Sequence, residues 1–243
     1  MAGAEVVAVP AFADNYIWLL HDSGSGYTAV VDPGDGEAAL RGAEQRGWTI
    51  GQILITHWHP DHTGGIERVK AATGAEVWGP EAERGKFAGL DQGLSEGDRV
   101  QVGPWSADIW EVPGHTLGHI AYVLPEIGTA FVGDTLFAMG CGRLFEGTPE
   151  QMFGSLQRLA ALPPETLAYP AHEYTLSNAR FAAHADPASE AVAERLREVE
   201  QLRSNGQVTL PTSIGREVAT NPFLRAADVR QFASLRSQKD SFR

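Results

Sequence analysis

The amino-acid sequence predicts a protein of mixed α and β structure, in which sheets are covered by helices and a small helical region follows. Two observations lead to this prediction. Short apolar runs alternate with amphipathic stretches over the first two-thirds of the chain, and glycine-containing turns separate them. After Tyr174 the signals for strands nearly disappear, and helix-forming residues become frequent. The pattern is compatible with two packed sheets or with one doubly wound sheet.

Strands are expected where runs of branched or aromatic apolar residues stop at turn-forming residues. The turn Asp32-Pro33-Gly34, for example, closes the third of these runs. By this criterion strands are expected at residues 6–9, 16–20, 29–31, 53–55, 77–78, 100–102, 109–112, 120–124, 130–132 and, as the last strand, 167–169.

Helices are expected where apolar residues recur with helical spacing between capping signals. Gly47 and Gly74 each stand where glycine commonly ends a helix. The clearest start is that of the third helix, since Thr148 can cap it, Pro149 suits the first helical position and Gln151 completes a capping box. The expected helices are 37–46, 63–73, 149–162, 187–203 and 226–235.

Chain length and composition fit a larger domain with a small appendage. The chain has 243 residues, of which 43% are hydrophobic, so it can bury a substantial core. Because the strand pattern stops near Tyr174, we expect one domain over residues 1–173 and a helical domain over residues 174–243.

Charge and cysteine content narrow the classes of function. The formal net charge is -12, and an acidic surface repels phosphate backbones and anionic lipids, so neither a nucleic acid nor a membrane is an expected partner. The only cysteine, Cys141, allows no internal disulfide, which fits a reducing compartment. The N-terminal residues do not form a signal peptide pattern. We therefore expect a cytoplasmic protein and, because no segment is typical of a dimer interface, a monomer.

The most informative segment carries three imidazoles and one carboxylate directly after a predicted buried strand: His57, His59, Asp61 and His62. On extended backbone His57 and His59 point the same way, because side chains alternate along a strand. Imidazole nitrogen and carboxylate oxygen suit zinc, iron or manganese. A polar surface loop is the alternative interpretation, but it does not explain such a cluster. Four ligands from one segment indicate two adjacent metal ions.

Three further candidate ligands, His115, Asp134 and His172, each follow a predicted strand. Loops that leave strand ends at one edge of a sheet can converge on one site. One ion would then be held by His57, His59 and His115, the other by Asp61, His62 and His172, with Asp134 bridging the two.

The order of these residues resembles that of the metallo-β-lactamase superfamily, over approximately residues 6–173. The resemblance implies an α+β fold, the αββα sandwich, with the site along one edge of the two sheets. Residues 1–173 would accordingly form the catalytic domain and residues 174–243 a helical substrate-binding domain.

Finer motifs resemble the hydroxyacylglutathione hydrolase, or glyoxalase II, family. They are Asp14-Asn15-Tyr16-Ile17, Gly140-Cys141-Gly142-Arg143-Leu144-Phe145-Glu146-Gly147, Ala171-His172-Glu173-Tyr174-Thr175, Asn221-Pro222-Phe223-Leu224-Arg225 and Lys239-Asp240-Ser241-Phe242-Arg243. This resemblance implies that Arg143, Tyr174, Arg236 and Lys239 contact glutathione. Some members have tyrosine where this chain has Phe145, so we expect a hydroxyl contact to be missing there.

The resemblance also implies the reaction, hydrolysis of S-(2-hydroxyacyl)glutathione, such as S-D-lactoylglutathione, to glutathione and D-lactate in the detoxification of methylglyoxal. Two divalent cations would share a bridging hydroxide that attacks the thioester, so no side-chain nucleophile is needed. Zinc is the expected metal, with iron or manganese as alternatives. Asp32 and His119 are expected to orient ligands, and Cys141 to be a packed structural residue.

Other functions of the same fold remain as alternatives. A lactonase would use the same ligands, whereas a persulfide dioxygenase needs one iron held by two histidines and one carboxylate. A zinc module without catalysis would have a closed site, often with cysteine. The complete second set of ligands, Asp61, His62 and His172, favours the hydrolase with two metal ions.

Overall fold

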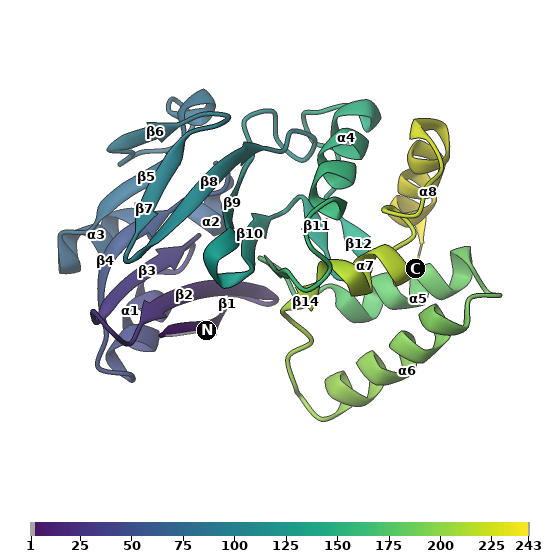
Figure 1. The fold of residues 1–243 in the computed structure, drawn as a ribbon, viewed down its shortest axis with the longest axis horizontal. Coiled ribbons are helices and arrows are strands. Elements are labelled where there is room, and N and C mark those ends of the chain that lie inside the picture. Colours follow the sequence, from purple (N-terminus) through teal and green to yellow (C-terminus); the bar gives the residue numbers. More distant parts are fainter. Residues whose placement is uncertain (1–2, 243) are drawn as a thin grey trace. The chain divides into compact units, whose positions relative to one another are not determined.

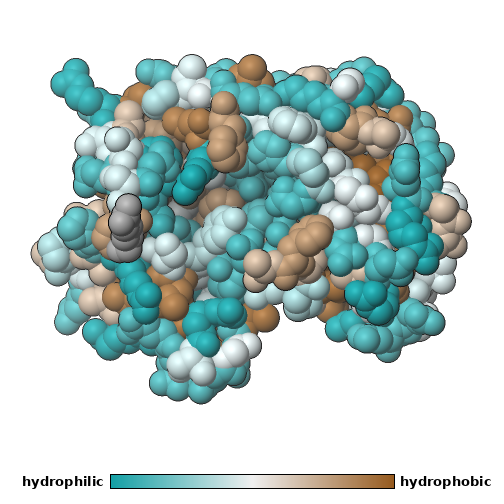
Figure 2. All heavy atoms as spheres, turned by 180° about the vertical axis from the view of Figure 1, so that it is seen from behind, coloured by the Kyte–Doolittle hydropathy of each residue, from teal (hydrophilic) through white to brown (hydrophobic). Residues whose placement is uncertain are grey.

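The computed structural model describes residues 3–242, which form two compact units. The first unit comprises residues up to 111 together with 118–133, and the second comprises 112–117 and the chain from 134 onward. Figure 1 shows the course of the chain through both. Hydrophilic residues cover most of the face seen in Figure 2, with hydrophobic residues in scattered patches. Within residues 3–242 no helix is long and apolar enough to cross a membrane.

The first unit contains a mixed sheet with the order β1-β2-β3-β4-β5-β6. The neighbours β1 to β3 are antiparallel, and β3 to β6 are parallel. The strands are β1 (Ala4–Ala11), β2 (Asn15–Asp22), β3 (Tyr27–Val31), β4 (Thr49–Leu54), β5 (Glu76–Pro80) and β6 (Gln92–Leu94). Every residue of β2 is buried, so this strand is covered on both faces.

Helices α1 (Gly36–Glu44) and α3 (Ile66–Thr73) cover one face of this sheet (Figure 1). Their residues Ala39 and Val69 share a buried cluster with Val30 and Ile53 of the sheet. Burial of such side chains contributes about 25 cal/mol per Å² of apolar surface, which makes this layer a principal source of stability.

The helix expected at 63–73 is divided in the structure. A single turn, α2 (Pro60–Thr63), comes first, and α3 begins only at Ile66. A Cβ atom at Gly65 would lie 2.2 Å from the carbonyl oxygen of Pro33. At Gly65 the chain therefore passes too close to another backbone segment for any residue but glycine. The helix is interrupted at this point, between Thr63 and Ile66.

A second set of antiparallel strands faces the first sheet. Its strands are β7 (Arg99–Val102), β8 (Trp105–Glu111), β9 (Ile120–Leu124) and β10 (Thr129–Gly133), and the short helical turns η1 (Glu81–Glu83) and η2 (Pro125–Ile127) lie between strands. The hydroxyl of Tyr122 on β9 donates to the carbonyl oxygens of Ile55 (2.9 Å) and Trp78 (3.1 Å). These bonds join the two sheets, so a sandwich of two sheets, and not one doubly wound sheet, is formed.

The second unit is mainly helical. Figure 1 shows its helices α4 (Pro149–Ala160), α5 (Thr175–Ala185), α6 (Glu190–Ser204), α7 (Ile214–Thr220) and α8 (Val229–Ser241), with the short strands β11 (Leu136–Phe137), β12 (Gly140–Cys141), β13 (Leu167–Pro170) and β14 (Thr212–Ser213). Helices α5 and α6 lie side by side, and Ala179, Ala182 and Val192 form a small core with Met139. The predicted capping box of Thr148 and Gln151 is present at the start of α4.

Two predicted helix starts in this unit were wrong. Helix α6 begins at Glu190, three residues later than expected, because the Ser189 side chain accepts a hydrogen bond from the Val192 nitrogen. Helix α8 begins at Val229, because the Asp228 side chain accepts from the Gln231 nitrogen, and it continues beyond the predicted end at residue 235. Capping groups close to each start thus decided both boundaries.

Several elements were not predicted. Helix α5 starts directly after Tyr174 without a side-chain cap, so its sequence lacks the usual start signal. Helix α7 has only seven residues, which is short for a pattern to be recognised. Strand β14 follows the strand expected to be the last, and the two-residue strands β11 and β12 are too short to show alternation.

Candidate metal centre

The loop after β4 carries the histidine cluster and is anchored by Asp32 at the end of β3. The Asp32 carboxylate accepts hydrogen bonds from the Thr56 backbone nitrogen (2.8 Å) and from the Thr56 hydroxyl (2.7 Å). Asp32 has a positive φ of 50°, a conformation that costs a non-glycine residue free energy and persists where the surroundings enforce it. A Cβ atom at Gly34 would lie 1.7 Å from the carbonyl oxygen of Asp61. The turn after β3 therefore packs directly against the loop.

Within this loop, imidazole nitrogens lie close together. The Nε2 atom of His57 is 3.0 Å from the Nδ1 atom of His59, and the ring centroids of His57 and His62 are 4.0 Å apart. Ligand atoms of Asp32, His57 and His62, all buried, lie within 4.8 Å of one another. Such a set of nitrogen and carboxylate donors has the chemistry of a site for zinc, iron or manganese.

The orientation of His62 is set by two carboxylates. Its Nδ1 atom is 3.1 Å from Asp32 Oδ2, and its Nε2 atom is 3.4 Å from Asp61 Oδ2. A carboxylate beside Nδ1 favours the tautomer with the proton on that nitrogen, which leaves Nε2 as the lone-pair donor. His62 therefore presents a ligand atom on the side of Asp61.

The backbone of the same loop is held by a buried carboxylate that the sequence did not single out. Glu83 Oε2 accepts from the Trp58 nitrogen (2.7 Å), and Oε1 accepts from the Gly118 nitrogen (3.2 Å). The neighbouring His119 is fully buried and stacks on His57 with ring centroids 4.6 Å apart. Nothing in the local pattern around Glu83 marks these partners, because both are distant in sequence.

The second unit has its own buried cluster of histidine and aspartate. The Nε2 atoms of His115 and His172 lie 3.4 Å and 3.3 Å from the same oxygen, Asp134 Oδ2. The Nδ1 atom of His115 lies 2.9 Å from the carbonyl oxygen of Arg143. Since a carbonyl oxygen only accepts, Nδ1 carries the proton and Nε2 is the lone-pair donor. One carboxylate oxygen between two imidazoles suits a cation.

Aromatic rings pack against both histidines of this second cluster. The ring of Tyr174 stacks on His172 at 4.7 Å, and the edge of Phe137 meets both, at 5.9 Å from His172 and 5.2 Å from Tyr174. The exposed ring of Phe145 lies 5.2 Å from His115. These rings limit the movement of the histidines and provide apolar surface beside them.

The three basic residues expected to bind substrate gather near one carboxylate in the second unit. Asp240 Oδ1 is 3.0 Å from Arg236 Nη2 and 3.8 Å from Arg143 Nε. Lys239 donates to the Ser177 hydroxyl at 2.8 Å. Burial, followed by the charges of Arg236 and Arg143, lowers the pKa of Lys239. A local excess of positive charge therefore exists in a protein whose net charge is -12.

Arg236 differs from the other two because it is buried. Its Nη1 atom donates to the carbonyl oxygen of Cys141 at 2.9 Å. Its Nε atom is buried and has no hydrogen-bond partner among residues 3–242. Burial raises the pKa of the Cys141 thiol to about 11, so this residue is a protonated, packed thiol at neutral pH and not a nucleophile.

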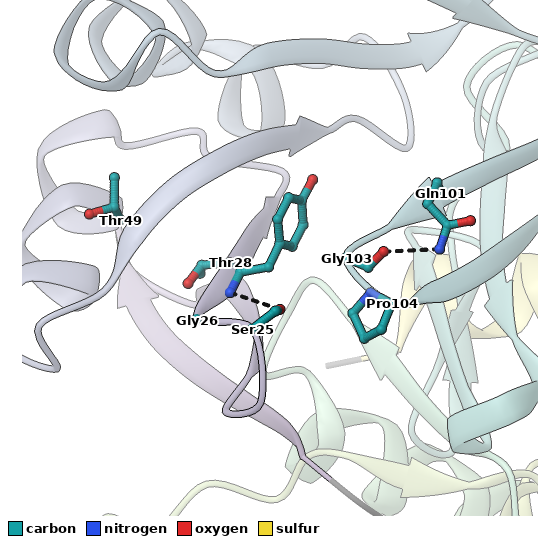
Figure 3. Close-up of a pocket in the computed structure, with 8 residues that line it drawn as sticks. Ser25, Gly26, Thr28, Thr49, Gln101, Gly103 and Pro104 are labelled. Atoms are coloured by element: carbon teal, nitrogen blue, oxygen red, sulfur yellow. Dashed lines mark hydrogen bonds between the residues drawn. The ribbon is translucent and has the colours of Figure 1, made fainter.

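A separate shallow pocket lies on the first unit, and Ser25, Gln101, Gly103 and Pro104 contribute to its wall (Figure 3). Gln101 donates to the Gly103 carbonyl oxygen at 2.9 Å within it. Its lining contains no histidine, cysteine or carboxylate. The pocket therefore offers none of these metal ligands. The buried clusters of histidine and aspartate do offer them and are consistent with a dinuclear metal site.

Comparisons with known proteins cover nearly the whole chain. Residues 12–172 match the family model described as the metallo-beta-lactamase superfamily, and residues 173–242 match the hydroxyacylglutathione hydrolase C-terminus. A hydroxyacylglutathione hydrolase from Erythrobacter litoralis is 50% identical over 250 residues, which span 98% of this chain and 99% of that protein. Two solved structures are also similar. ETHE1 from Myxococcus xanthus has a TM-score of 0.73 at 24% identity, covering 96% of this chain and 89% of its own. TTHA1623 in a di-iron-bound form has a TM-score of 0.64 at 26% identity, and the match covers 90% of this chain and 100% of that chain.

Proposed function

This chain belongs to the hydroxyacylglutathione hydrolase family of the metallo-beta-lactamase superfamily, and we propose from this premise that it hydrolyses the thioester of S-(2-hydroxyacyl)glutathione. The observation that carries the proposal is the identity of 50% over the full length of a relative with that name. The family, the fold and the enzyme class predicted from the sequence are thereby confirmed.

We propose that the buried clusters form one site for two divalent cations. His57, His59 and His115 would hold one ion, and Asp61, His62 and His172 the other, with Asp134 between them. When bound, such ions would lower the pKa of a water molecule and polarise the substrate carbonyl. Zinc is our proposed metal because nitrogen and oxygen donors suit it. Iron is the alternative, supported by the di-iron-bound form of TTHA1623, and manganese would also accept these donors.

The chain's own residues prepare this site by fixing protons and orientations. Asp32 keeps a proton on His62 Nδ1, and the Arg143 carbonyl oxygen keeps one on His115 Nδ1, so that both Nε2 atoms remain available as ligands. We propose that His119, stacked on His57, restricts the orientation of that ring. Burial raises the pKa of the Cys141 thiol to about 11, so we assign this residue no nucleophilic role and propose that water attacks the thioester.

Substrate recognition follows from the charge of glutathione, which carries carboxylates. Arg143 and Lys239 offer cationic groups at the surface of the second unit, and the buried Arg236 adds positive charge beside them. We propose that Tyr174 lines the glutathione site, while Phe145 provides ring contact without a hydroxyl. The thiolate of glutathione is a good leaving group, so its departure needs little protonation.

The division into a catalytic part, residues 1–173, and a substrate-binding helical part, residues 174–243, stays part of this proposal. It is supported by the two family models, which meet between residues 172 and 173. The product from S-D-lactoylglutathione would be D-lactate, which places the reaction in the detoxification of methylglyoxal.

The proposal is tested by an assay of S-D-lactoylglutathione hydrolysis, in which the loss of thioester absorbance is measured over time. Purified protein should turn the substrate over, lose activity on chelation and regain it when zinc, iron or manganese is added back. Absence of turnover by protein shown to contain two metal equivalents would overturn the thioesterase assignment. Lactone hydrolysis, or oxygen consumption with glutathione persulfide, would in that event identify one of the two alternative activities.

A further inference from the structure

Asn15, the first residue of β2, contacts a proposed metal ligand that lies 46 residues away in sequence. Its side-chain nitrogen Nδ2 donates to the Asp61 carboxylate oxygen Oδ2 at 3.0 Å and lies 3.5 Å from the Asp61 carbonyl oxygen. Sequence reasoning assigned Asn15 no role, although it stands in the motif Asp14-Asn15-Tyr16-Ile17. The contact therefore requires its own explanation.

The two partners differ in how firmly the fold holds them. Asn15 is only 7% exposed, and its backbone pairs with Ala11 across the β1–β2 hairpin. The Asp61 side chain is 41% exposed and lies on the loop that follows β4. An exposed carboxylate samples several rotamers, and fixing it costs conformational entropy. The hydrogen bond from the buried Asn15 amide restricts this freedom.

The chemistry of asparagine suits this task. An amide nitrogen has two hydrogens, which can serve the carboxylate and the backbone carbonyl of the same residue. Because the amide is neutral, it fixes Oδ2 without cancelling the negative charge that a cation requires. Oδ2 also lies 3.4 Å from His62 Nε2, so the hydrogen bond holds the carboxylate beside the lone pair of the next proposed ligand.

We propose that Asn15 is a positioning residue that presents Asp61 to one of the two cations and thereby sets the affinity for that ion. The inference rests on the proposed dinuclear site, because Asp61 and His62 serve only one ion of the pair. It assigns Asn15 no contact with substrate. Loss of the amide should consequently weaken one of the two metal-binding steps and leave the other unchanged.

The test is a titration of the metal-depleted full-length protein with zinc in competition with a chromophoric chelator, together with metal analysis of the purified protein. Asn15→Ala should bind one equivalent as the wild type does and the other roughly 10- to 100-fold more weakly, the usual cost of losing a group that orients a ligand. Asn15→Ser, which keeps a polar side chain in the strand but is too short for the contact, should behave alike and provides the test if Asn15→Ala does not fold.

Asn178→Ala is the matched control, since Asn178 is also a buried asparagine and donates to the Ala138 carbonyl oxygen at 3.1 Å. It should lower the melting temperature but retain two zinc-binding steps of wild-type affinity. Wild-type affinity for both ions in folded Asn15 variants would overturn the inference and leave the proposed function intact. A wild-type protein that binds a single equivalent would instead contradict the dinuclear site on which both proposals rest.

Discussion

The carboxylate of Asp32 lies 3.1 Å from the Nδ1 atom of His62, thirty residues further along the chain. The same carboxylate accepts two hydrogen bonds from Thr56. The Asp32 side chain therefore anchors the start of the histidine loop at Thr56 and fixes the tautomer of His62 within that loop. Its own backbone is in the left-handed region, with φ at 50°, so these contacts compensate for a strained conformation.

Asp32→Asn should weaken zinc binding roughly 10- to 100-fold, because the amide cannot accept from both Thr56 and His62 and the His62 tautomer is no longer fixed. Competition with a chelator measures the affinity. Asp98→Asn is the control, since Asp98 is exposed and its side chain accepts a local hydrogen bond from the Ser95 nitrogen. Equal affinity of Asp32→Asn and wild type would show that Asp32 does not orient the ligand.

The buried thiol of Cys141 should be unreactive in the native protein. With its pKa raised to about 11, on the order of one thiol in a thousand is ionised at pH 8, and only the thiolate reacts. A chromogenic disulfide reagent should therefore detect no thiol in native protein and one per chain after unfolding. Cys141→Ala should retain thioesterase activity. Rapid modification of the native protein with loss of activity would contradict this assignment.

Glu217 should make a pH-dependent contribution to stability. It is fully buried and accepts hydrogen bonds from the Met139 nitrogen, the Thr212 hydroxyl and the Asn221 amide. Burial raises the pKa of Glu217 above its ordinary value of 4.5. For an acid with a raised pKa in the folded state, stability is present below the unfolded pKa and is lost as pH rises through the folded pKa.

The comparison of wild type with Glu217→Gln isolates this effect. As pH rises from 4.5, the wild type should lose free energy of unfolding relative to the variant, because the amide does not titrate. Urea denaturation at a series of pH values measures the difference between the two proteins. A difference that stays constant, or that shifts in favour of the wild type with rising pH, would show that the pKa of Glu217 is not raised.

Lys239 should govern substrate affinity more than turnover. Lys239→Met should raise KM for S-D-lactoylglutathione about 10-fold or more with little change in kcat, since a hydrogen bond to a charged group contributes about 1.5–3 kcal/mol. Because burial and neighbouring arginines lower the pKa of Lys239, the wild-type KM should also rise with pH below 10.5, as the cation is lost. Steady-state kinetics across that range provide the measurement.

Lys70→Met is the control for Lys239, because Lys70 pairs with Asp91 in the first unit and not with the basic cluster. Its KM should match that of the wild type at every pH. If Lys70→Met and Lys239→Met changed KM alike, a general effect of net charge would explain both, and Lys239 would have no specific role.

Features encoded within a few neighbouring residues could be predicted from the sequence. The capping box of Thr148 and Gln151 and the glycine at 74 were confirmed where their patterns occur. The dense cluster between His57 and His62, together with the motifs downstream, was sufficient to identify the family, which the comparisons confirm. Each of these signals depends on spacing along the chain, and spacing is visible without a fold.

Only the tertiary structure decided which distant groups meet. The hydroxyl of Tyr122 bonds to the carbonyl oxygens of Ile55, directly after β4, and of Trp78 on β5, which shows that two sheets face each other. Asn15 forms a hydrogen bond with Asp61, and Glu83 forms hydrogen bonds with Trp58 and Gly118. No local sequence pattern predicts these contacts. The physical reason is that such partners are brought together by the packing of whole sheets and helices, so that each contact depends on many residues at once.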